Sequence, residues 1–300
     1  MKKKFLYRIA AVGASALLML GSSVMLAGCK TSNDPEVTIT YTFNGKDYAV
    51  NYTLSRVDAP KTVQHFIELA DAGFYDGLVV HDYQNDTICS GGYRMDEGGE
   101  LVEVDYLTEV KRLEEEKKIS FTQSVWEDEA RTKPVYSVYG EFVKNGVENE
   151  NGKKNVHSEG ALVMYYTDKG TGNEQVWVER ADGGAGNDGN RYQQLSYSYN
   201  SITSLFYTFT GSSRLSADEK YCVIGKATNY KEAMTNGLLA AIAEYEKTLD
   251  EEETFTETVE GYTLNKYDYF SSVRAAGMTA DYKVPTSMRI VIKSVVVTKY

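Results

Sequence analysis

Residues 58–92 of this chain read DAPKTVQHFIELADAGFYDGLVVHDYQNDTICSGG, and this stretch decides the fold. Its first third predicts a helix, because apolar residues recur at helical spacing from Val63 to Ala70. Pro60 suits the first helical turn, where a missing N–H costs nothing, and Gly73 stands where a C-terminal cap belongs. The remainder predicts two short strands and a glycine pair (residues 78–80, 87–89 and Gly91-Gly92).

The segment before this helix predicts a β-hairpin. Hydrophobic and polar residues alternate over 37–43 and again over 48–54, with Asn44-Gly45 between them. Asn-Gly between two alternating runs is the strongest short-range hairpin signal, because both turn residues must accept a positive φ. Other expected elements follow along the chain: strands at 135–143, 160–166, 221–227 and 288–298, helices within 94–133 and at about 231–249, and a long loop over 181–201.

Many short strands with two or three helices indicate a closed or nearly closed sheet whose openings are plugged by helices. The Asp/Asn/Gly run at 182–190 raises calcium as an alternative, but the EF-hand spacing and its closing Glu are absent. No Cys/His spacing typical of a metal site occurs either. We therefore expect neither a metal nor a cofactor.

The composition is that of a globular protein. Hydrophobic residues make up 42% and charged residues 25%, which excludes wholesale disorder and a multi-span membrane protein. Lysine and arginine number 32 against 43 acids; residues 1–28 hold four of the bases and no acid, so the rest carries 28 against 43, or −15. A surface this acidic is unsuited to phosphate backbones, so no nucleic-acid partner is expected.

The first thirty residues have the pattern of an export signal. Residues 1–8 are basic, residues 9–26 are apolar with small residues, and the segment ends Leu26-Ala27-Gly28-Cys29. These last four residues resemble a bacterial lipobox, in which the cysteine receives a diacylglycerol and becomes the new N-terminus. A single transmembrane anchor is the alternative, since about 18 residues is near the lower limit for a span.

We therefore expect a signal peptide over 1–28 and a lipidated Cys29 with a short tether over 29–36. Two acyl chains anchor a protein stably, so the mature chain would lie on the extracytoplasmic face of a bacterial cell membrane. Two other thiols remain, Cys89 and Cys222. An exported domain permits a disulfide between them, and two buried free thiols are the default.

The block quoted first resembles the front half of a bacterial cyclophilin, a peptidyl-prolyl cis/trans isomerase. Residues 58–70 lead into residues 73–81, and Gly91-Gly92 follows ten residues later. Further segments are similar to the family's middle, penultimate and closing stretches: Tyr139-Gly140-Glu141-Phe142, Gly160 to Met164, Gln175-Val176-Trp177-Val178, Lys220 to Lys226 and Ile290 to Val297. The resemblance implies a mainly β fold over residues 37–300: an eight-stranded closed antiparallel β-barrel with capping helices, and inserts near 94–133, 179–213 and 250–284.

In cyclophilins an arginine beside the bound proline donates to the proline nitrogen or the adjacent carbonyl, an apolar pocket holds the ring, and a glutamine positions the backbone. The resemblance places Asp82 at the arginine position. An ionised carboxylate accepts hydrogen bonds and donates none. The remaining positions fall on Thr87, Ile88 and Ser90 in the pocket, Gln175 as the positioning glutamine, Trp177 as the second pocket aromatic and Tyr221 at the pocket rim.

The missing donor predicts weak or absent isomerase activity, unless Arg94 or Arg180 swings in to replace it. The expected function is that of a membrane-anchored cyclophilin-type protein that acts on or binds exported polypeptides containing proline. The alternative is a non-enzymatic protein- or ligand-binding lipoprotein that reuses the barrel groove and a tyrosine-rich insert. Tyrosine suits such recognition because it combines a large contact area with a polar tip, and four tyrosines gather there: Tyr192, Tyr197, Tyr199 and Tyr207.

Overall fold

The computed structural model describes residues 34–142, 145, 147, 158–166, 174–180, 183–197, 201–211, 222–263, 269–270 and 279–300. All of them belong to one compact unit, residues 32–300. Three residues that the sequence singled out, Cys29, Tyr199 and Tyr221, lie outside the described residues, and so does the signal segment 1–28. None of the helices in the described part of the chain has the length and hydropathy needed to cross a membrane.

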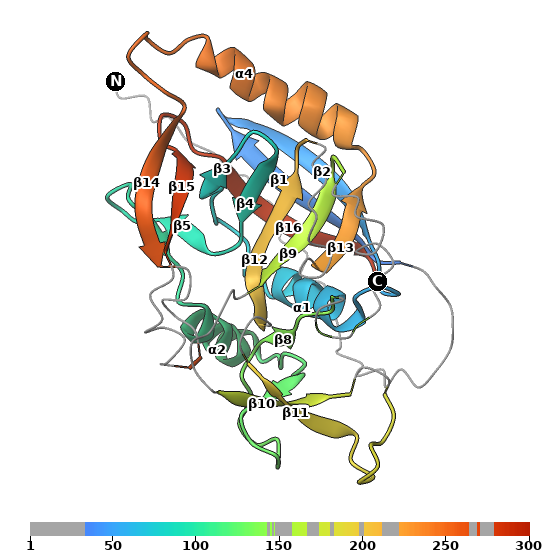
Figure 1. Ribbon diagram of the computed structural model, residues 1–300. Coiled ribbons are helices and arrows are strands. Elements are labelled where there is room, and N and C mark those ends of the chain that lie inside the picture. Colours follow the sequence, from blue (N-terminus) through green and yellow to red (C-terminus); the bar gives the residue numbers. More distant parts are fainter. Residues whose placement is uncertain are drawn as a thin grey trace, which may run out of the picture. The chain divides into compact units, whose positions relative to one another are not determined.

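The central sheet is antiparallel and strongly curled (Figure 1). Its strands run in the order β16-β1-β2-β13-β9-β12-β4-β3, and β8 pairs with β12. The strand bounds are β1 (Glu36–Phe43), β2 (Lys46–Leu54), β3 (Asp82–Tyr83), β4 (Thr87–Ser90), β8 (Val138–Tyr139), β9 (Ala161–Tyr166), β12 (Ser201–Phe209), β13 (Cys222–Ala227) and β16 (Val291–Lys299). The predicted mainly β fold with an eight-stranded antiparallel barrel architecture is confirmed by the eight strands of this order, to which the two-residue β8 is added at β12.

The chain just before β3 joins the two ends of this sheet. Gly77 donates its N–H to the Ile292 carbonyl at 2.8 Å, and Ile292 donates to the Leu78 carbonyl at 2.7 Å. Val80 donates to the Ile290 carbonyl at 2.9 Å. Because the same chain continues into β3, which pairs with β4, residues 77–83 connect β16 to β4.

The local predictions for the N-terminal half hold. β1 and β2 form the expected hairpin, with Asn44 and Gly45 both at positive φ (47° and 72°). Helix α1 (Pro60–Asp71) begins at Pro60 as predicted. It ends where Gly73 turns to positive φ, and the Phe74 N–H then donates to the Leu69 carbonyl, which satisfies a carbonyl at the helix end.

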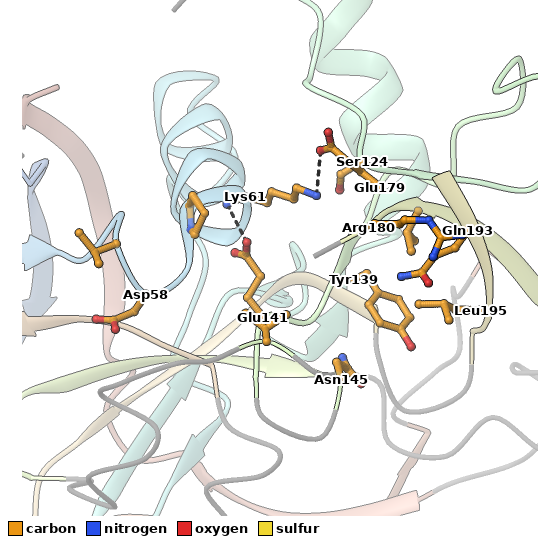
Figure 2. Close-up of a pocket in the computed structure, with 14 residues that line it drawn as sticks. Asp58, Lys61, Ser124, Tyr139, Glu141, Asn145, Glu179, Arg180, Gln193 and Leu195 are labelled. Carbon is orange, nitrogen blue, oxygen red and sulfur yellow. Dashed lines mark hydrogen bonds and ion pairs between the residues drawn. The ribbon is translucent and has the colours of Figure 1, made fainter. Parts of the chain in front are cut away.

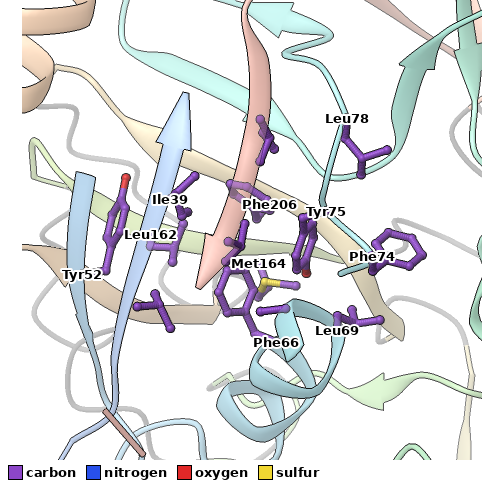
Figure 3. Packing of buried hydrophobic residues seen from close by; sticks show 14 of the residues in the cluster. Ile39, Tyr52, Phe66, Leu69, Phe74, Tyr75, Leu78, Leu162, Met164 and Phe206 are labelled. Carbon is purple, nitrogen blue, oxygen red and sulfur yellow. The ribbon is translucent and has the colours of Figure 1, made fainter. Parts of the chain in front are cut away.

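Helices lie at both openings of the curled sheet (Figure 1). At one opening, α1 inserts Phe66, whose ring packs 5.2 Å from Tyr75 and 5.7 Å from Phe206 of β12 (Figure 3). At the other, the helical segment η2 (Lys231–Leu239) and α4 (Ala240–Glu246) packs against the first hairpin, with Tyr245 edge-on to Phe43 at 5.7 Å. Hydrophobic burial is the main favourable term in folding, so these plugs complete the core.

The segments outside the central sheet form three smaller units. The bounds are β5 (Tyr93–Met95) and β6 (Leu101–Glu103), followed by α2 (Tyr106–Lys117); then β7 (Val125–Trp126), β10 (Gln175–Glu179) and β11 (Tyr192–Ser196); then β14 (Thr256–Thr263) and β15 (Thr279–Pro285). The second unit is a three-stranded sheet in the order β11-β10-β7, here called the accessory sheet.

Two expectations for the second insert need correction. The long loop predicted over 181–201 contains a strand, β11, which pairs with β10 over its whole length. The range 179–213 also contains β12, which is a strand of the central sheet and not an insertion. Pairing with β10 supplies the hydrogen bonds that make residues 192–196 a strand, although their Asn/Gly-rich neighbourhood predicts a loop.

The thiols of Cys89 and Cys222 are both free, as the default interpretation had it. Cys222 is fully buried in the main core, where its Sγ lies 3.5 Å from the Thr62 hydroxyl. Cys89 packs in a separate cluster with Val163, Tyr207 and other apolar residues.

Phe66→Ala should lower the free energy of unfolding by about 3–5 kcal/mol, because it removes a fully buried ring from between α1 and the sheet. Chemical denaturation monitored by circular dichroism measures this change. Val57→Ala is the control, since Val57 is 76% exposed and should change the free energy by less than about 0.5 kcal/mol. A loss below about 1 kcal/mol for Phe66→Ala would contradict the packing described.

Candidate functional site

Asp82 lies on β3, and its carboxylate is already engaged by the protein's own chain. Oδ1 accepts the backbone N–H of Lys283 at 2.8 Å and the side-chain amide of Gln84 at 2.7 Å. Burial raises the pKa of the Asp82 carboxyl above its ordinary value, and the bonds from Lys283 and Gln84 oppose that rise. Asp82 therefore acts here as a hydrogen-bond acceptor for a strand that arrives from the third insert.

That strand is β15, which forms a hairpin with β14 over the outer face next to Asp82. Tyr282, the neighbour of Lys283, packs edge-on against His81 with ring centroids 5.0 Å apart, and against Tyr93 at 5.7 Å. Together with Val79 and Val284, these residues form a small hydrophobic cluster that is almost completely buried. The β14–β15 hairpin thus covers the face on which the sequence placed a substrate site.

His81 is part of this packing and is only 3% exposed. Its ring lies 4.4 Å from that of Tyr93, and burial lowers its pKa to about 3, so the imidazole is neutral at physiological pH. In the described part of the chain its Nδ1 has no hydrogen-bond partner. His81 is therefore a packed structural residue at this position.

A cavity of about 140 Å³ remains between β3, β12 and β15. Sites for small-molecule ligands usually span about 300–1,000 Å³, so the space is small. Its described lining contains two acids and neither arginine nor lysine (His81, Asp82, Cys89, Tyr165, Leu205, Phe206, Ala280, Asp281 and Tyr282). The described lining thus offers no cationic donor.

The three predicted pocket residues on β4 do not form one surface. Ile88 is 1% exposed and belongs to the main core, and Ser90 is fully buried beside Phe206 of β12. Thr87 is partly exposed. Because side chains alternate along a strand, Ile88 and Ser90 point inward together and are unavailable to a ligand on the outer face.

The two glycines after β4 are required because no side chain would fit at either position. A Cβ at Gly91 would lie 2.2 Å from the Ser204 carbonyl oxygen, and one at Gly92 would lie 2.4 Å from the Leu205 side chain. Gly91 also has a φ of +101°. Only glycine allows β12 to pass so close to the end of β4.

Gln175 and Trp177 are not near Asp82. Both lie on β10 of the accessory sheet, and neither lines the cavity beside Asp82. The arginines that the sequence offered as substitutes are also elsewhere. Arg94 is exposed on β5, and Arg180 donates through Nε to the Asn190 carbonyl at 3.0 Å.

A larger cleft of about 690 Å³ lies between the start of α1 and the accessory sheet (Figure 2). On its wall, the Glu141 carboxylate accepts the N–H of Thr62 at 2.8 Å and that of Lys61 at 3.2 Å, as well as the Thr62 hydroxyl. Burial raises the pKa of Glu141, and the bonds from Thr62 oppose the rise. This acid satisfies orphan donors at the N-terminus of α1 and so fixes the helix to the chain after β8.

The same cleft joins α1 to the accessory sheet through charge. Lys61 Nζ lies 3.1 Å from Glu179 on β10 (Figure 2). Glu179 also pairs with Arg191. These groups are partly exposed, so each pair contributes at most about 1 kcal/mol. The described lining of the cleft thus carries charges of both signs beside apolar side chains.

A comparison of the sequence with known protein families gives a match that covers much of the barrel. Residues 38–181 match the family model described as cyclophilin type peptidyl-prolyl cis-trans isomerase/CLD. This part of the chain is a cyclophilin-type domain. A comparison of the sequence with curated proteins gave no match.

Among solved structures, the chain is similar to a cyclophilin type peptidyl-prolyl cis-trans isomerase of Cryptosporidium parvum. The identity is 13%, the TM-score is 0.41, and the match covers 89% of this chain and 99% of that one. The same protein in the presence of the dipeptide Ala-Pro gives 13% identity and a TM-score of 0.40, covering 88% and 99%.

The cyclophilin-type sheet also shows which strand the sequence interpretation missed. The strand between β4 and β9 is β12, which places Leu205 at the cavity beside Asp82 and Tyr207 opposite Cys89. The signal was present, because Ser201–Phe209 is rich in β-branched and aromatic residues and just precedes β13. The sequence interpretation instead assigned Gln175 to Val178 to the site, because that run resembles the family motif more closely.

Two of the four clustered tyrosines turn out to be core residues. Tyr197 is 3% exposed and packs 4.7 Å from Phe270, and Tyr207 is 5% exposed and packs 5.5 Å from Phe209. Tyr192 is partly exposed on β11. The tyrosine-rich surface suggested by the sequence is thus reduced, in the described part, to Tyr192.

Asp82→Asn should raise the free energy of unfolding at pH 7 by a few tenths to about 1 kcal/mol. Asparagine keeps an oxygen for the Lys283 N–H but has no charge to desolvate. Because burial raises the pKa of Asp82 in the folded state, its stabilising contribution is complete below its unfolded pKa of about 3.9 and is lost as the pH rises through the folded pKa. Denaturation at pH 3 and pH 7 should therefore show the advantage of the variant only at pH 7.

Asp47→Asn is the opposite-sign control. The pKa of Asp47 is lowered, chiefly by its hydrogen bond from Lys293, so this variant should lose stability at pH 7 relative to pH 3. An Asp82→Asn effect that is equal at both pH values would contradict the buried position described for this carboxylate.

Proposed function

We propose that this chain is a membrane-tethered, cyclophilin-type binding protein for exported polypeptides that has lost prolyl isomerase activity. One observation carries the proposal: the Asp82 carboxylate accepts the Lys283 N–H beneath the β14–β15 hairpin. At the position where the family resemblance expects an arginine that donates, the chain has an acid that accepts. That acid is committed to the fold.

The electrostatics argue against catalysis at this face. Rotation about a peptide bond faces a barrier of about 18–20 kcal/mol, and an isomerase must stabilise the twisted amide with a preorganised donor. Loss of one such donor typically costs about 10²–10³ in rate. Asp82 and Asp281 are the charged groups in the described lining of the cavity, and a carboxylate repels the carbonyl oxygen of a substrate.

Steric access argues in the same direction. The Tyr282 ring packs on His81 and Tyr93, and the cluster that they form with Val79 and Val284 is almost completely buried. A peptide could reach the outer face beside Asp82 only if this cluster opened. The energy of binding would then have to offset the exposure of several apolar side chains.

A protease-coupled isomerisation assay on Ala-Pro peptides measures the activity directly. The wild-type chain should catalyse at least about 100-fold more slowly than an ordinary cyclophilin assayed beside it. A wild-type rate within tenfold of that reference contradicts the proposal. If a wild-type activity were found and then abolished by Arg94→Ala or Arg180→Ala, a relocated catalytic arginine would replace this explanation.

Asp82→Arg distinguishes two causes of inactivity, the missing hydrogen-bond donor and the covering β14–β15 hairpin. If the hairpin covers the site, this variant should remain inactive, because arginine restores the donor but leaves Tyr282 packed on His81. A gain of more than tenfold in the same assay would show that the groove is open and that the acid alone prevents catalysis. Pairing it with Tyr282→Ala tests whether removal of the packed ring and restoration of the donor are both needed.

Membrane tethering rests on the sequence Leu26-Ala27-Gly28-Cys29 after the apolar run. The full chain produced in bacteria should partition into the detergent phase of Triton X-114, because two acyl chains bind a membrane stably. Cys29→Ser removes the acceptor thiol, so this variant should remain an uncleaved precursor that carries no lipid. Metabolic labelling with palmitate distinguishes the two forms: label in wild type and none in Cys29→Ser supports the tether, and no label in either contradicts it.

A further inference from the structure

The cavity of about 140 Å³ beside Asp82 lies in a region of negative charge. The charged side chains of its described lining are the carboxylates of Asp82 and Asp281. A third acid acts from nearby, because burial raises the pKa of the Cys89 thiol, and the charges of Asp82 and Asp86 add to that rise. Such a concentration of like charge raises the local concentration of cations.

Lys283 is the cation that lies closest to this carboxylate along β15, and it does not fill the cavity. Its side chain is exposed and is not part of the described lining. The group that bonds to the Asp82 carboxylate is the backbone N–H of Lys283 and not its ammonium. Within the described part of the chain, the charge of Asp82 therefore has no direct ion pair.

Two hydrogen-bond acceptors at the cavity have no partner among the described residues. Asp82 Oδ1 accepts bonds from Lys283 and Gln84, whereas Oδ2 accepts none there. His81, which is 3% exposed and borders the cavity, has a buried Nδ1 without a hydrogen-bond partner. In the tautomer that carries its proton on Nε2, this Nδ1 accepts a hydrogen bond. A buried polar atom without a partner costs free energy, so a bound donor that reaches it is favoured.

Aromatic and apolar side chains form the rest of the described lining. Tyr165, Phe206 and Tyr282 border the cavity, and the faces of aromatic rings attract cations. Leu205 and Ala280 add aliphatic surface. A cavity of about 150 Å³ in another protein holds one benzene molecule, so this one accommodates a group of about five or six non-hydrogen atoms.

We propose that this cavity binds a primary ammonium group on a short alkyl stem, as carried by a small aliphatic amine or by a lysine side chain. An ammonium has three donors, so it can bond to Asp82 Oδ2 and to His81 Nδ1 together. Hydrogen bonds from an ammonium to a carboxylate are among the stronger ones in proteins. The alkyl stem packs against Leu205 and Phe206.

Other cations match the cavity less well. No group of three or more His, Cys, Asp or Glu side chains in the described ranges is placed to hold a metal ion. A guanidinium is a planar fork that is best matched by both oxygens of a carboxylate, and Oδ1 of Asp82 is already occupied. An ammonium is compact and needs a single oxygen, which Oδ2 supplies.

This inference goes beyond the proposed function, because it depends on the charge and size of the cavity and not on the loss of isomerase activity. The two fail separately. A wild-type isomerase rate close to that of an ordinary cyclophilin would contradict the proposed function and leave amine binding standing. A failure to bind the amine would leave the isomerase result unchanged.

Isothermal titration calorimetry of the full chain with n-butylamine, which is protonated at pH 7, tests the proposal. The wild-type chain should bind it saturably. It should bind n-butanol at least about tenfold more weakly, because the alcohol has the same number of non-hydrogen atoms but no charge. The peptide acetyl-Gly-Lys-Gly-amide distinguishes the two sources of the ammonium. Binding at least as tight as that of butylamine identifies a lysine side chain, and butylamine binding without peptide binding identifies a free amine.

Asp82→Asn should weaken the affinity for butylamine at least about tenfold, because it removes the charge and keeps an oxygen for the Lys283 N–H. Lys283→Gln should strengthen the affinity, since it removes a nearby positive charge and keeps the backbone N–H. Asp47→Asn is the matched control, because it removes one acid from β2 and should leave the affinity unchanged.

The comparison of butylamine with butanol uses the wild-type chain, so it is decisive even if a variant fails to fold by circular dichroism. No saturation at up to tens of millimolar butylamine would overturn the proposal. Equal affinity for butylamine and butanol, or equal affinity of wild type and a folded Asp82→Asn for butylamine, would overturn it as well.

Discussion

The central sheet depends on residues 77–83, which hydrogen-bond to β16 on one side and, through β3, pair with β4 on the other. A curled antiparallel sheet with open ends would expose two unpaired edges, and such edges are liabilities. Because this short connection joins them, its side chains are held rigidly between two strands. His81 and Asp82 lie within it, so the same constraint that completes the sheet also positions the two residues at the candidate site.

That constraint explains how an acid persists where the family resemblance expects a base. Asp82 sits at the edge of the sheet next to an insert that supplies a strand of its own, and the carboxylate accepts a backbone N–H of that strand. A guanidinium in the same place has no acceptor to offer Lys283. The acid and the hairpin therefore form one structural arrangement.

The inserts also change which surfaces surround the barrel. The β14–β15 hairpin covers the outer face beside Asp82, and the accessory sheet carries both tryptophans, Trp126 and Trp177. Between the accessory sheet and α1 lies the larger cleft, whose wall is fixed by Glu141 at the helix N-terminus.

The sequence by itself determined the features that depend on residues close together along the chain. The Asn44-Gly45 hairpin, helix α1 from Pro60 to its glycine cap, the barrel class and the acid at position 82 all follow from local patterns and a family motif. Tertiary structure alone decided that β12 and not β10 lies beside β4, that Ile88 and Ser90 face inward, and that β15 reaches Asp82. The physical reason is distance along the chain: Asp82 and Lys283 are 201 residues apart, and no short-range propensity specifies which distant strand completes a ladder.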